Sequence, residues 1–134
     1  QSPKIMTPHM MEFARLTKKT ILEVKDDCLS IAKILAKEYH SIVVCKDAVT
    51  LVVQEEGLTY LNHSGNSGMS TAGSGDVLTG IIGALIGQGE NLFEGAAKAV
   101  YIHGLAGDSA ADLYTEYGVT ASRLIENIRN MERL

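Results

Sequence analysis

An amphipathic pattern occupies positions 26 to 40. Its apolar residues recur every three or four positions: Cys28, Ile31, Ala32, Leu35, Ala36 and Tyr39. This spacing predicts a helix, and Asp26 and Asp27 are favourable near its start because the helix dipole is positive there. The next five residues, SIVVC at 41–45, form an unbroken apolar run rich in β-branched side chains. Such a run predicts a strand that is covered on both faces.

Two further apolar stretches predict a β-hairpin. They are TLVVQ at 50–54 and LTYLN at 58–62, and the residues EEG at 55–57 separate them. Two strand-like runs that are joined by a short turn with a glycine are typical of a hairpin.

Three helices are predicted in the second half of the chain. The first follows a glycine-rich stretch, ends near Gly87 or Gly89, and carries an apolar face of Val77, Leu78, Ile81, Ile82, Leu85 and Ile86. The second begins with Asn91 as its N-cap and Glu94 three positions later. Its small residues suit close packing: Ala96, Ala97, Gly104, Ala106 and Gly107. The last covers about 120–131, and the alternation of strands and helices indicates an α/β fold.

Composition narrows the possible functions. The chain has 134 residues, of which 46% are hydrophobic and 21% charged, so we expect one globular unit over 1–134. A net charge of -4 and a pI near 5.5 argue against a nucleic-acid partner. No apolar run is long enough for a membrane span and the start lacks a signal-peptide pattern, which predicts a cytoplasmic protein. Cys28 and Cys45 lie far apart in sequence and form no CxxC motif, so we expect reduced core residues.

The stretch STAGSGDVLTG at 70–80 carries the candidate chemistry. Four glycines, at 65, 68, 73 and 75, precede Asp76, and an apolar helix follows. The first amides of a helix have no internal partners, so this junction favours phosphate or an oxyanion. A carboxylate there suits a proton acceptor or a metal contact during phosphoryl transfer. The stretch is neither a Walker A loop, because no Lys follows the glycines, nor a GxGxxG motif.

The sequence GNSGMSTAGSGDVLTGIIGALIGQG at 65–89 closely resembles the signature of the ADP- or ATP-dependent NAD(P)H-hydrate dehydratases. This family belongs to the ribokinase-like superfamily. Further segments follow in the family's order: TPHMMEFARL at 7–16, VVCKDAVT at 43–50, AVYIHGLAGDSAAD at 99–112 and TASRLIENI at 120–128. The resemblance implies the C-terminal portion of a three-layer α/β/α domain, with a short sheet, a hairpin and about four to five helices.

The resemblance also implies an activity. Members phosphorylate the ring hydroxyl of hydrated NADH or NADPH (NADHX or NADPHX) and then eliminate phosphate. The phosphoryl donor is ADP or ATP, and Mg²⁺ is the accompanying cofactor. It implies Asp76 as the catalytic base and substrate contact, an anion hole from the amides of Gly73, Ser74 and Gly75, and His9 as a second substrate contact. Nucleotide contacts are implied at Lys46, Asp47, Ala48, Val49, Thr50 and Gly75. No protein metal ligand is implied. Lys46 also follows a predicted strand, where open α/β sheets place ligands.

Several alternatives stay open. The segment PKIM at 3–6 matches the end of a central strand, so we expect the first half of the domain to be absent. We then expect self-association or pairing with that half. A ribokinase-like kinase of a thiazole or pyrimidine alcohol would use the same loop. Asp47, where the family has glycine, and the absent half favour a non-enzymatic nucleotide-binding remnant. On the residues alone, His9 suits a capping role, and His103 and Asp108 suit packing or capping.

Overall fold

The computed structural model describes residues 4–131, which form one sheet with helices on both of its faces. The strands are β1 (Lys4–Met6), β2 (Ser41–Cys45), β3 (Thr50–Val53) and β4 (Thr59–Asn62). Their order across the sheet is β1-β2-β3-β4, with β1 parallel to β2 and the other pairs antiparallel. The predicted hairpin is thus confirmed, and its turn holds Gly57 at φ 96°.

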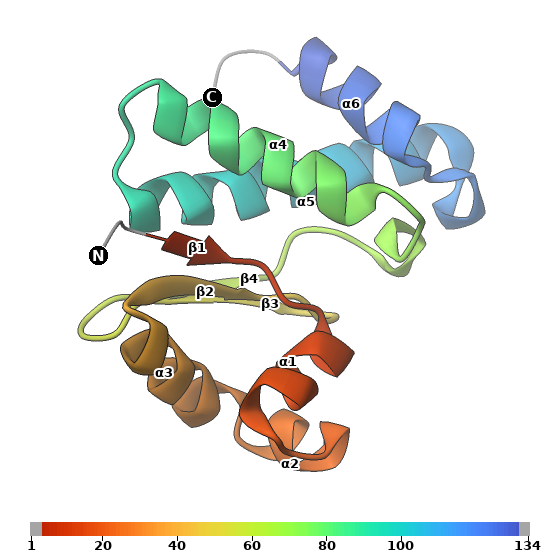
Figure 1. Cartoon of the computed structure of the whole chain (residues 1–134). Coiled ribbons are helices and arrows are strands. Elements are labelled where there is room, and N and C mark those ends of the chain that lie inside the picture. Colours follow the sequence, from red (N-terminus) through yellow and green to blue (C-terminus); the bar gives the residue numbers. More distant parts are fainter. Residues whose placement is uncertain (1–3, 132–134) are drawn as a thin grey trace.

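Helices form the two outer layers, and these are shown in Figure 1. One layer contains α1 (Met10–Thr17), α2 (Ile21–Asp26) and α3 (Cys28–Tyr39). The other contains α4 (Ser74–Gly87) and α5 (Leu92–Tyr114), beside which α6 (Ala121–Asn130) packs. Two short 3-10 turns, η1 (Ser67–Met69) and η2 (Glu116–Gly118), complete the described chain. The three-layer α/β/α arrangement is as predicted.

Strand β2 lies at the centre of the core. Successive side chains of a strand point to opposite faces, so Val43 and Cys45 pack with α1, α2 and α3, whereas Ile42 and Val44 pack with α4 and α5. All five residues of β2 are buried, as the apolar run predicts. Because each buried aliphatic side chain contributes roughly 1.5–3 kcal/mol, this strand holds the two layers together.

Six α-helices are present in residues 4–131, rather than four to five. The additional elements are α1 and α2, which span 8 and 6 residues and are too short for a clear apolar period. Each begins with a capping box: the side chain at the N-cap and a glutamate three residues later bond each other's backbone amides. The N-cap residues are His9 and Thr20, with Glu12 and Glu23 as their glutamate partners.

The longer helices agree with the sequence analysis. Helix α3 begins at Cys28 with Asp27 as its N-cap, so Asp27 lies at the helix start as predicted, whereas Asp26 is instead the last residue of α2. Helix α5 begins after Asn91, whose side chain accepts a 2.9 Å hydrogen bond from the amide of Glu94. Helix α6 has Thr120 as its N-cap and buries Leu124. Among the helices of residues 4–131, none combines the length and the apolar character that crossing a bilayer requires.

Candidate functional site

The glycine loop joins the hairpin to α4, as predicted. Gly73 is the N-cap of α4 with φ 83°, a conformation that side-chain-bearing residues rarely adopt. The first hydrogen bond of the helix runs from the Val77 amide to the Gly73 carbonyl at 3.1 Å. The amides of Gly75 and Asp76 lie before this bond, so they have no partner within the helix. The Ser74 amide donates to the Thr71 carbonyl at 3.2 Å. The loop therefore presents the positive end of α4, with Gly75 as its second residue.

Two hollows meet at this loop. The larger hollow has a volume of about 710 Å³ and is lined by His9, Lys46, Asp47, Ala48, Thr50, Ser74 and Gly75, among others. The smaller hollow has a volume of about 560 Å³ and contains Asp76 together with Pro8, Glu12 and Arg15. Lys46 and Gly75 line both hollows. The structure thus gathers the predicted site residues at one place, except that Gly73 and Val49 do not line either hollow.

Lys46 connects the strand end to the glycine loop. It follows β2, and its amide donates to the Pro8 carbonyl at 3.0 Å. It also forms a parallel bridge with His9, which brings the segment before α1 to the strand end. A Cβ atom added to Gly75 would lie 3.1 Å from Lys46 Nζ. The absence of a side chain at position 75 therefore leaves room for this ammonium group beside the first turn of α4.

Asp47 is not an isolated negative charge. Its carboxylate Oδ2 lies 3.9 Å from Lys25 Nζ, on α2. Both side chains are partly exposed, so the pair is weak, but the cation offsets part of the repulsion between this carboxylate and an anion in the larger hollow. The negative charge of Asp47 is therefore partly compensated by Lys25.

His9 has the capping role that its residue type suggests. Its Nδ1 accepts a 3.3 Å hydrogen bond from the Glu12 amide, and Glu12 Oε2 accepts one of 2.9 Å from the His9 amide. Its Nε2 lies 3.3 Å from Glu12 Oε1. Because Nδ1 is an acceptor, Nε2 carries the ring proton. His9 also lines the larger hollow, so its capping geometry holds it beside Lys46.

His103 belongs to the site, although its sequence context indicates only packing or capping. From α5, its Nε2 lies 3.0 Å from the Ser74 carbonyl oxygen and 3.2 Å from Ser74 Oγ. A carbonyl can only accept, so Nε2 carries the proton. Burial lowers the pKa of His103 and nearby Lys46 lowers it further, whereas the hydrogen bond to Ser74 opposes them. His103 is therefore neutral near pH 7 and holds the start of α4 as a hydrogen-bond donor.

Asp108 fixes the other end of the glycine loop. Its Oδ2 accepts a 2.9 Å hydrogen bond from the Gly65 amide, and its Oδ1 accepts one of 3.1 Å from Asn66 Nδ2. One turn earlier on α5, Gly104 lies so close to the loop that an added Cβ would clash with Ser64 at 2.0 Å from Oγ. Helix α5 therefore contacts the loop in two ways: the Asp108 carboxylate accepts hydrogen bonds from it, and Gly104 lets the two backbones approach closely.

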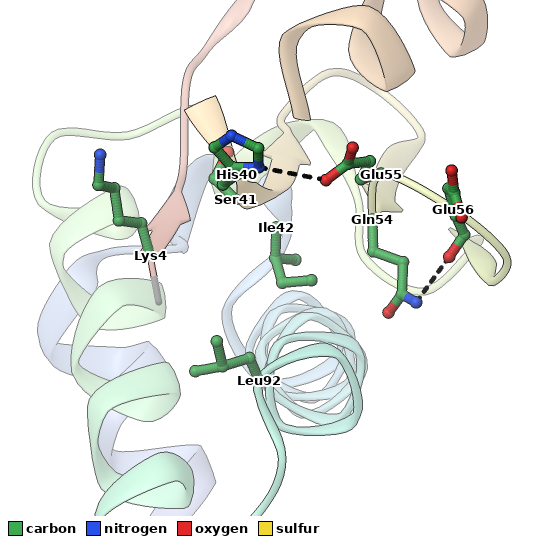
Figure 2. A pocket seen from close by; sticks show the side chains of 8 residues that line it. All are labelled: Lys4, His40, Ser41, Ile42, Gln54, Glu55, Glu56 and Leu92. Atoms are coloured by element: carbon green, nitrogen blue, oxygen red, sulfur yellow. Dashed lines mark hydrogen bonds and ion pairs between the residues drawn. The ribbon is translucent and has the colours of Figure 1, made fainter. Parts of the chain in front are cut away.

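A third hollow, of about 450 Å³, lies at the opposite end of the sheet and is shown in Figure 2. It is lined by the start of β2 and the segment after β3. Its Glu55 lies 3.5 Å from His40 Nδ1, and Gln54 Nε2 donates to the Glu56 carbonyl at 2.7 Å. These polar groups bond one another. The first residue of α5, Leu92, also lines this hollow, but it presents an apolar side chain there, and no residue of the glycine loop is among the lining residues. We therefore place the candidate site at the two hollows beside Asp76.

Comparison with known proteins identifies the family of this chain. The family profile described as NAD(P)H-hydrate dehydratase matches residues 1–130. The bifunctional NAD(P)H-hydrate repair enzyme Nnr of Moorella thermoacetica is 42% identical over 134 residues, covering 97% of this chain and 25% of that protein. The ADP-dependent (S)-NAD(P)H-hydrate dehydratase of Neisseria meningitidis is 43% identical over 104 residues, covering 78% of this chain and 35% of that protein.

A solved structure shares the fold closely. The ADP/ATP-dependent NAD(P)H-hydrate dehydratase from Bacillus subtilis, co-crystallized with ATP and Mg²⁺, superposes with a TM-score of 0.90 at 29% identity. The match covers 96% of this chain and 46% of that one. This chain therefore spans about a quarter to a third of the two curated relatives and about half of the solved protein. Since the family profile covers nearly all of its residues, the chain belongs to the NAD(P)H-hydrate dehydratase family.

Proposed function

We propose that this chain carries the phosphoryl-transfer site of an enzyme that repairs hydrated NADH and NADPH. The observation that supports this most directly is that Asp76, Lys46 and Gly75 line one hollow. A proton acceptor, a cation and the start of a helix are the groups that a phosphoryl transfer from a nucleotide to an alcohol requires. The names of the relatives supply the substrate class.

The proposed reaction has two steps. The carboxylate of Asp76 accepts the proton of the ring hydroxyl, whose oxygen attacks the terminal phosphorus of the nucleotide and displaces a nucleotide with one phosphate fewer. The phosphate ester then leaves as inorganic phosphate while the adjacent ring carbon loses a proton, and the ring double bond reforms. His9 lines the larger hollow, where it would contact the nicotinamide nucleotide.

We propose that the adenine nucleotide lies along the larger hollow. Lys46, Asp47, Ala48 and Thr50 line this hollow, and the adjoining Val49 would contact the nucleotide from the same segment. The amides of Gly73 and Gly75 at the start of α4 would form the anion hole for the transferring phosphate, because the helix dipole is positive there. The Ser74 amide already donates to the Thr71 carbonyl, so it would join them only by giving up that bond. The solved Bacillus subtilis relative was co-crystallized with ATP and Mg²⁺, which supports this nucleotide class.

Mg²⁺ would arrive with the nucleotide. Within residues 4–131, no group of three His, Cys, Asp or Glu side chains is arranged to hold a metal ion. Mg²⁺ keeps several waters and is bound mainly by substrate phosphates with one or two carboxylates, so these residues fit the ion. Asp76 and Asp47, each in a different hollow, are the carboxylates that could approach it. When bound, the ion neutralises charge on the phosphates.

We also propose that the working site includes a further polypeptide, either the other half of the domain or a second copy. Strand β1 pairs with β2 on one edge, and no strand within residues 4–131 pairs with its other edge. Helix α4 leaves Gly80, Gly83 and Gly87 uncovered, with nothing within 4 Å of a Cβ atom built there. An open strand edge beside an uncovered apolar helix favours association.

The test is a product analysis on the polypeptide at its native length, whose intact mass also shows whether it includes further sequence. Hydrated NADH is incubated with ADP or ATP and Mg²⁺, and the reduced-nicotinamide absorbance and inorganic phosphate are measured together. Reduced nicotinamide and inorganic phosphate formed in equal molar amounts support the proposal. A stable phosphoester of a thiazole or pyrimidine alcohol, with no effect on hydrated NADH, would instead establish a kinase. Nucleotide binding without either product would establish a non-enzymatic remnant.

A further inference from the structure

The two cysteines, although distant in sequence, are adjacent in the fold. Cys28 Sγ lies 3.5 Å from Cys45 Sγ, across 17 positions of sequence. Cys28 is the first residue of α3, and Cys45 is the last residue of β2, immediately before Lys46. Both are free thiols. We propose that Cys28 and Cys45 form a peroxide-reactive dithiol site, which closes to a disulfide beside the nucleotide-binding strand end.

The surroundings of the two sulfurs differ in a way that assigns each a role. Cys45 is fully buried, whereas Cys28 is partly exposed at the edge of the core. An oxidant in solution therefore reaches Cys28 first. The start of α3 favours a thiolate at Cys28, because the helix dipole is positive there and its N-cap, Asp27, makes no side-chain hydrogen bond to the helix amides.

Hydrogen bonding between the thiols strengthens this asymmetry. A bond from the Cys45 thiol lowers the pKa of Cys28, against the opposing effects of burial and of the carboxylates of Asp47 and Asp27. The same interaction, with burial, raises the pKa of Cys45. Oxidation of Cys28 to a neutral group removes the thiolate that accepts the hydrogen bond from the Cys45 thiol. The contribution of that bond to the raised pKa of Cys45 is then lost.

The chemistry balances with hydrogen peroxide as the oxidant. The Cys28 thiolate attacks one peroxide oxygen, the O–O bond breaks, and Cys28 becomes a sulfenic acid while hydroxide leaves. Cys45 then attacks the Cys28 sulfur, an S–S bond forms, and the sulfenic oxygen leaves as water with the Cys45 proton. Two thiols lose two electrons in total, and the peroxide is reduced to water. The sulfurs approach by about 1.5 Å, from the observed separation to disulfide length.

The experiment treats the full chain, first reduced, with hydrogen peroxide under native conditions. We expect both free thiols to be lost, the intact mass to fall by two hydrogen atoms, and digestion to release one peptide pair linked through Cys28 and Cys45. Closure should be about tenfold faster in the folded chain than in the same chain in denaturant, because the fold holds the sulfurs together.

Two variants separate the roles. In Cys45→Ala, oxidation should stop at a sulfenic acid on Cys28, which dimedone traps. In Cys28→Ala, Cys45 should stay reduced under the same treatment because it is buried. The proposal is overturned if the parent chain gains oxygen at both cysteines without a link, if it forms only links between chains, or if folding does not accelerate closure. Circular dichroism confirms that each variant is folded before treatment.

Discussion

The Nε2 atom of His103 donates to the carbonyl oxygen of Ser74 at 3.0 Å, which ties the middle of α5 to the first residue of α4. The Ser74 hydroxyl lies 3.2 Å from the same nitrogen. These two residues are 29 positions apart in sequence. The start of α4, where we propose that phosphate binds, is therefore held by a partly buried histidine on α5.

The first prediction concerns the pH dependence that His103 confers. Its folded-state pKa lies below the ordinary value of 6.5, so the unfolded chain binds more protons as the pH falls below that value. Native stability is therefore fully present above about pH 6.5 and is lost as the pH falls through the lower folded-state pKa. His103→Gln keeps a donor at the ε position but does not titrate. Between about pH 8 and pH 5.5, the free energy of unfolding should fall more for the parent chain than for His103→Gln.

Urea denaturation at the two pH values measures this difference. His103→Leu, which removes the donor, should be less stable than His103→Gln at both pH values, because the Ser74 carbonyl loses its partner. Equal pH dependence in the parent chain and His103→Gln would contradict a lowered pKa for this histidine.

The second prediction concerns Gly75. An alanine there would place a Cβ atom 3.1 Å from Lys46 Nζ and displace the ammonium group. We expect ADP affinity to fall by about tenfold, which corresponds to ~1.4 kcal/mol, while the chain stays folded because α4 keeps its apolar face. Isothermal titration calorimetry with ADP and Mg²⁺ measures the change.

Gly83 provides the matched control on the same helix. Nothing lies within 4 Å of a Cβ atom built at this position. In the 134-residue chain by itself, where no other polypeptide covers this face of α4, Gly83→Ala should leave ADP affinity unchanged and stabilise the chain by roughly 0.5–1 kcal/mol through helix propensity. If both variants bind ADP like the parent, Lys46 and Gly75 do not form part of a nucleotide site.

The third prediction concerns the contact of α5 with the glycine loop. An alanine at Gly104 would place its Cβ atom 2.0 Å from Ser64 Oγ and 2.7 Å from the Ser64 carbonyl carbon, so backbone must move. We expect Gly104→Ala to lower the free energy of unfolding by about 1–3 kcal/mol. Urea denaturation measures the loss. A variant as stable as the parent would show that the loop and α5 are not in close contact.

The fourth prediction concerns the base. Asp76→Asn preserves the shape of the side chain and removes the proton acceptor, so repair of hydrated NADH should fall by about 10²–10⁴-fold in the native-length polypeptide. ADP binding should survive, because the amides of the loop and Lys46 are unchanged. Initial rates and calorimetry on the same preparation separate the two effects. Near-parental turnover would remove Asp76 from the proposed role.

Much of the architecture follows from the sequence because its signals are local. The apolar run at β2, the turn of the hairpin and the Asn91 N-cap each act within a few residues, and each appears in the structure as predicted. Helices α1 and α2 escaped prediction because one or two turns hold too few apolar positions to show a period. Their capping boxes, at His9 and Thr20, are the signals that could have identified them.

The candidate site was predicted in part for the same reason. The glycine loop and Asp76 are contiguous, and Lys46 follows a recognisable strand, so their chemistry is visible in the sequence. His103 and Asp108 act on the loop from a helix that lies far along the chain, and spacing carries no signal for such a contact. The adjacency of Cys28 and Cys45 likewise depends on how α3 packs on β2, which the sequence pattern does not specify.

The larger hollow is built by segments that meet only when both helical layers are in place on the sheet. His9 and Lys46 come from one side, Ser74 and His103 from the other, and Gly65 is held by Asp108 across 43 positions. The unfolded chain therefore holds no equivalent cavity, and any ligand of this hollow shifts the folding equilibrium by mass action. At a free concentration of 100 times its dissociation constant, such a ligand stabilises the native chain by about 2.7 kcal/mol. The melting temperature thus becomes a readout of occupancy for candidate nucleotides, even where no turnover occurs.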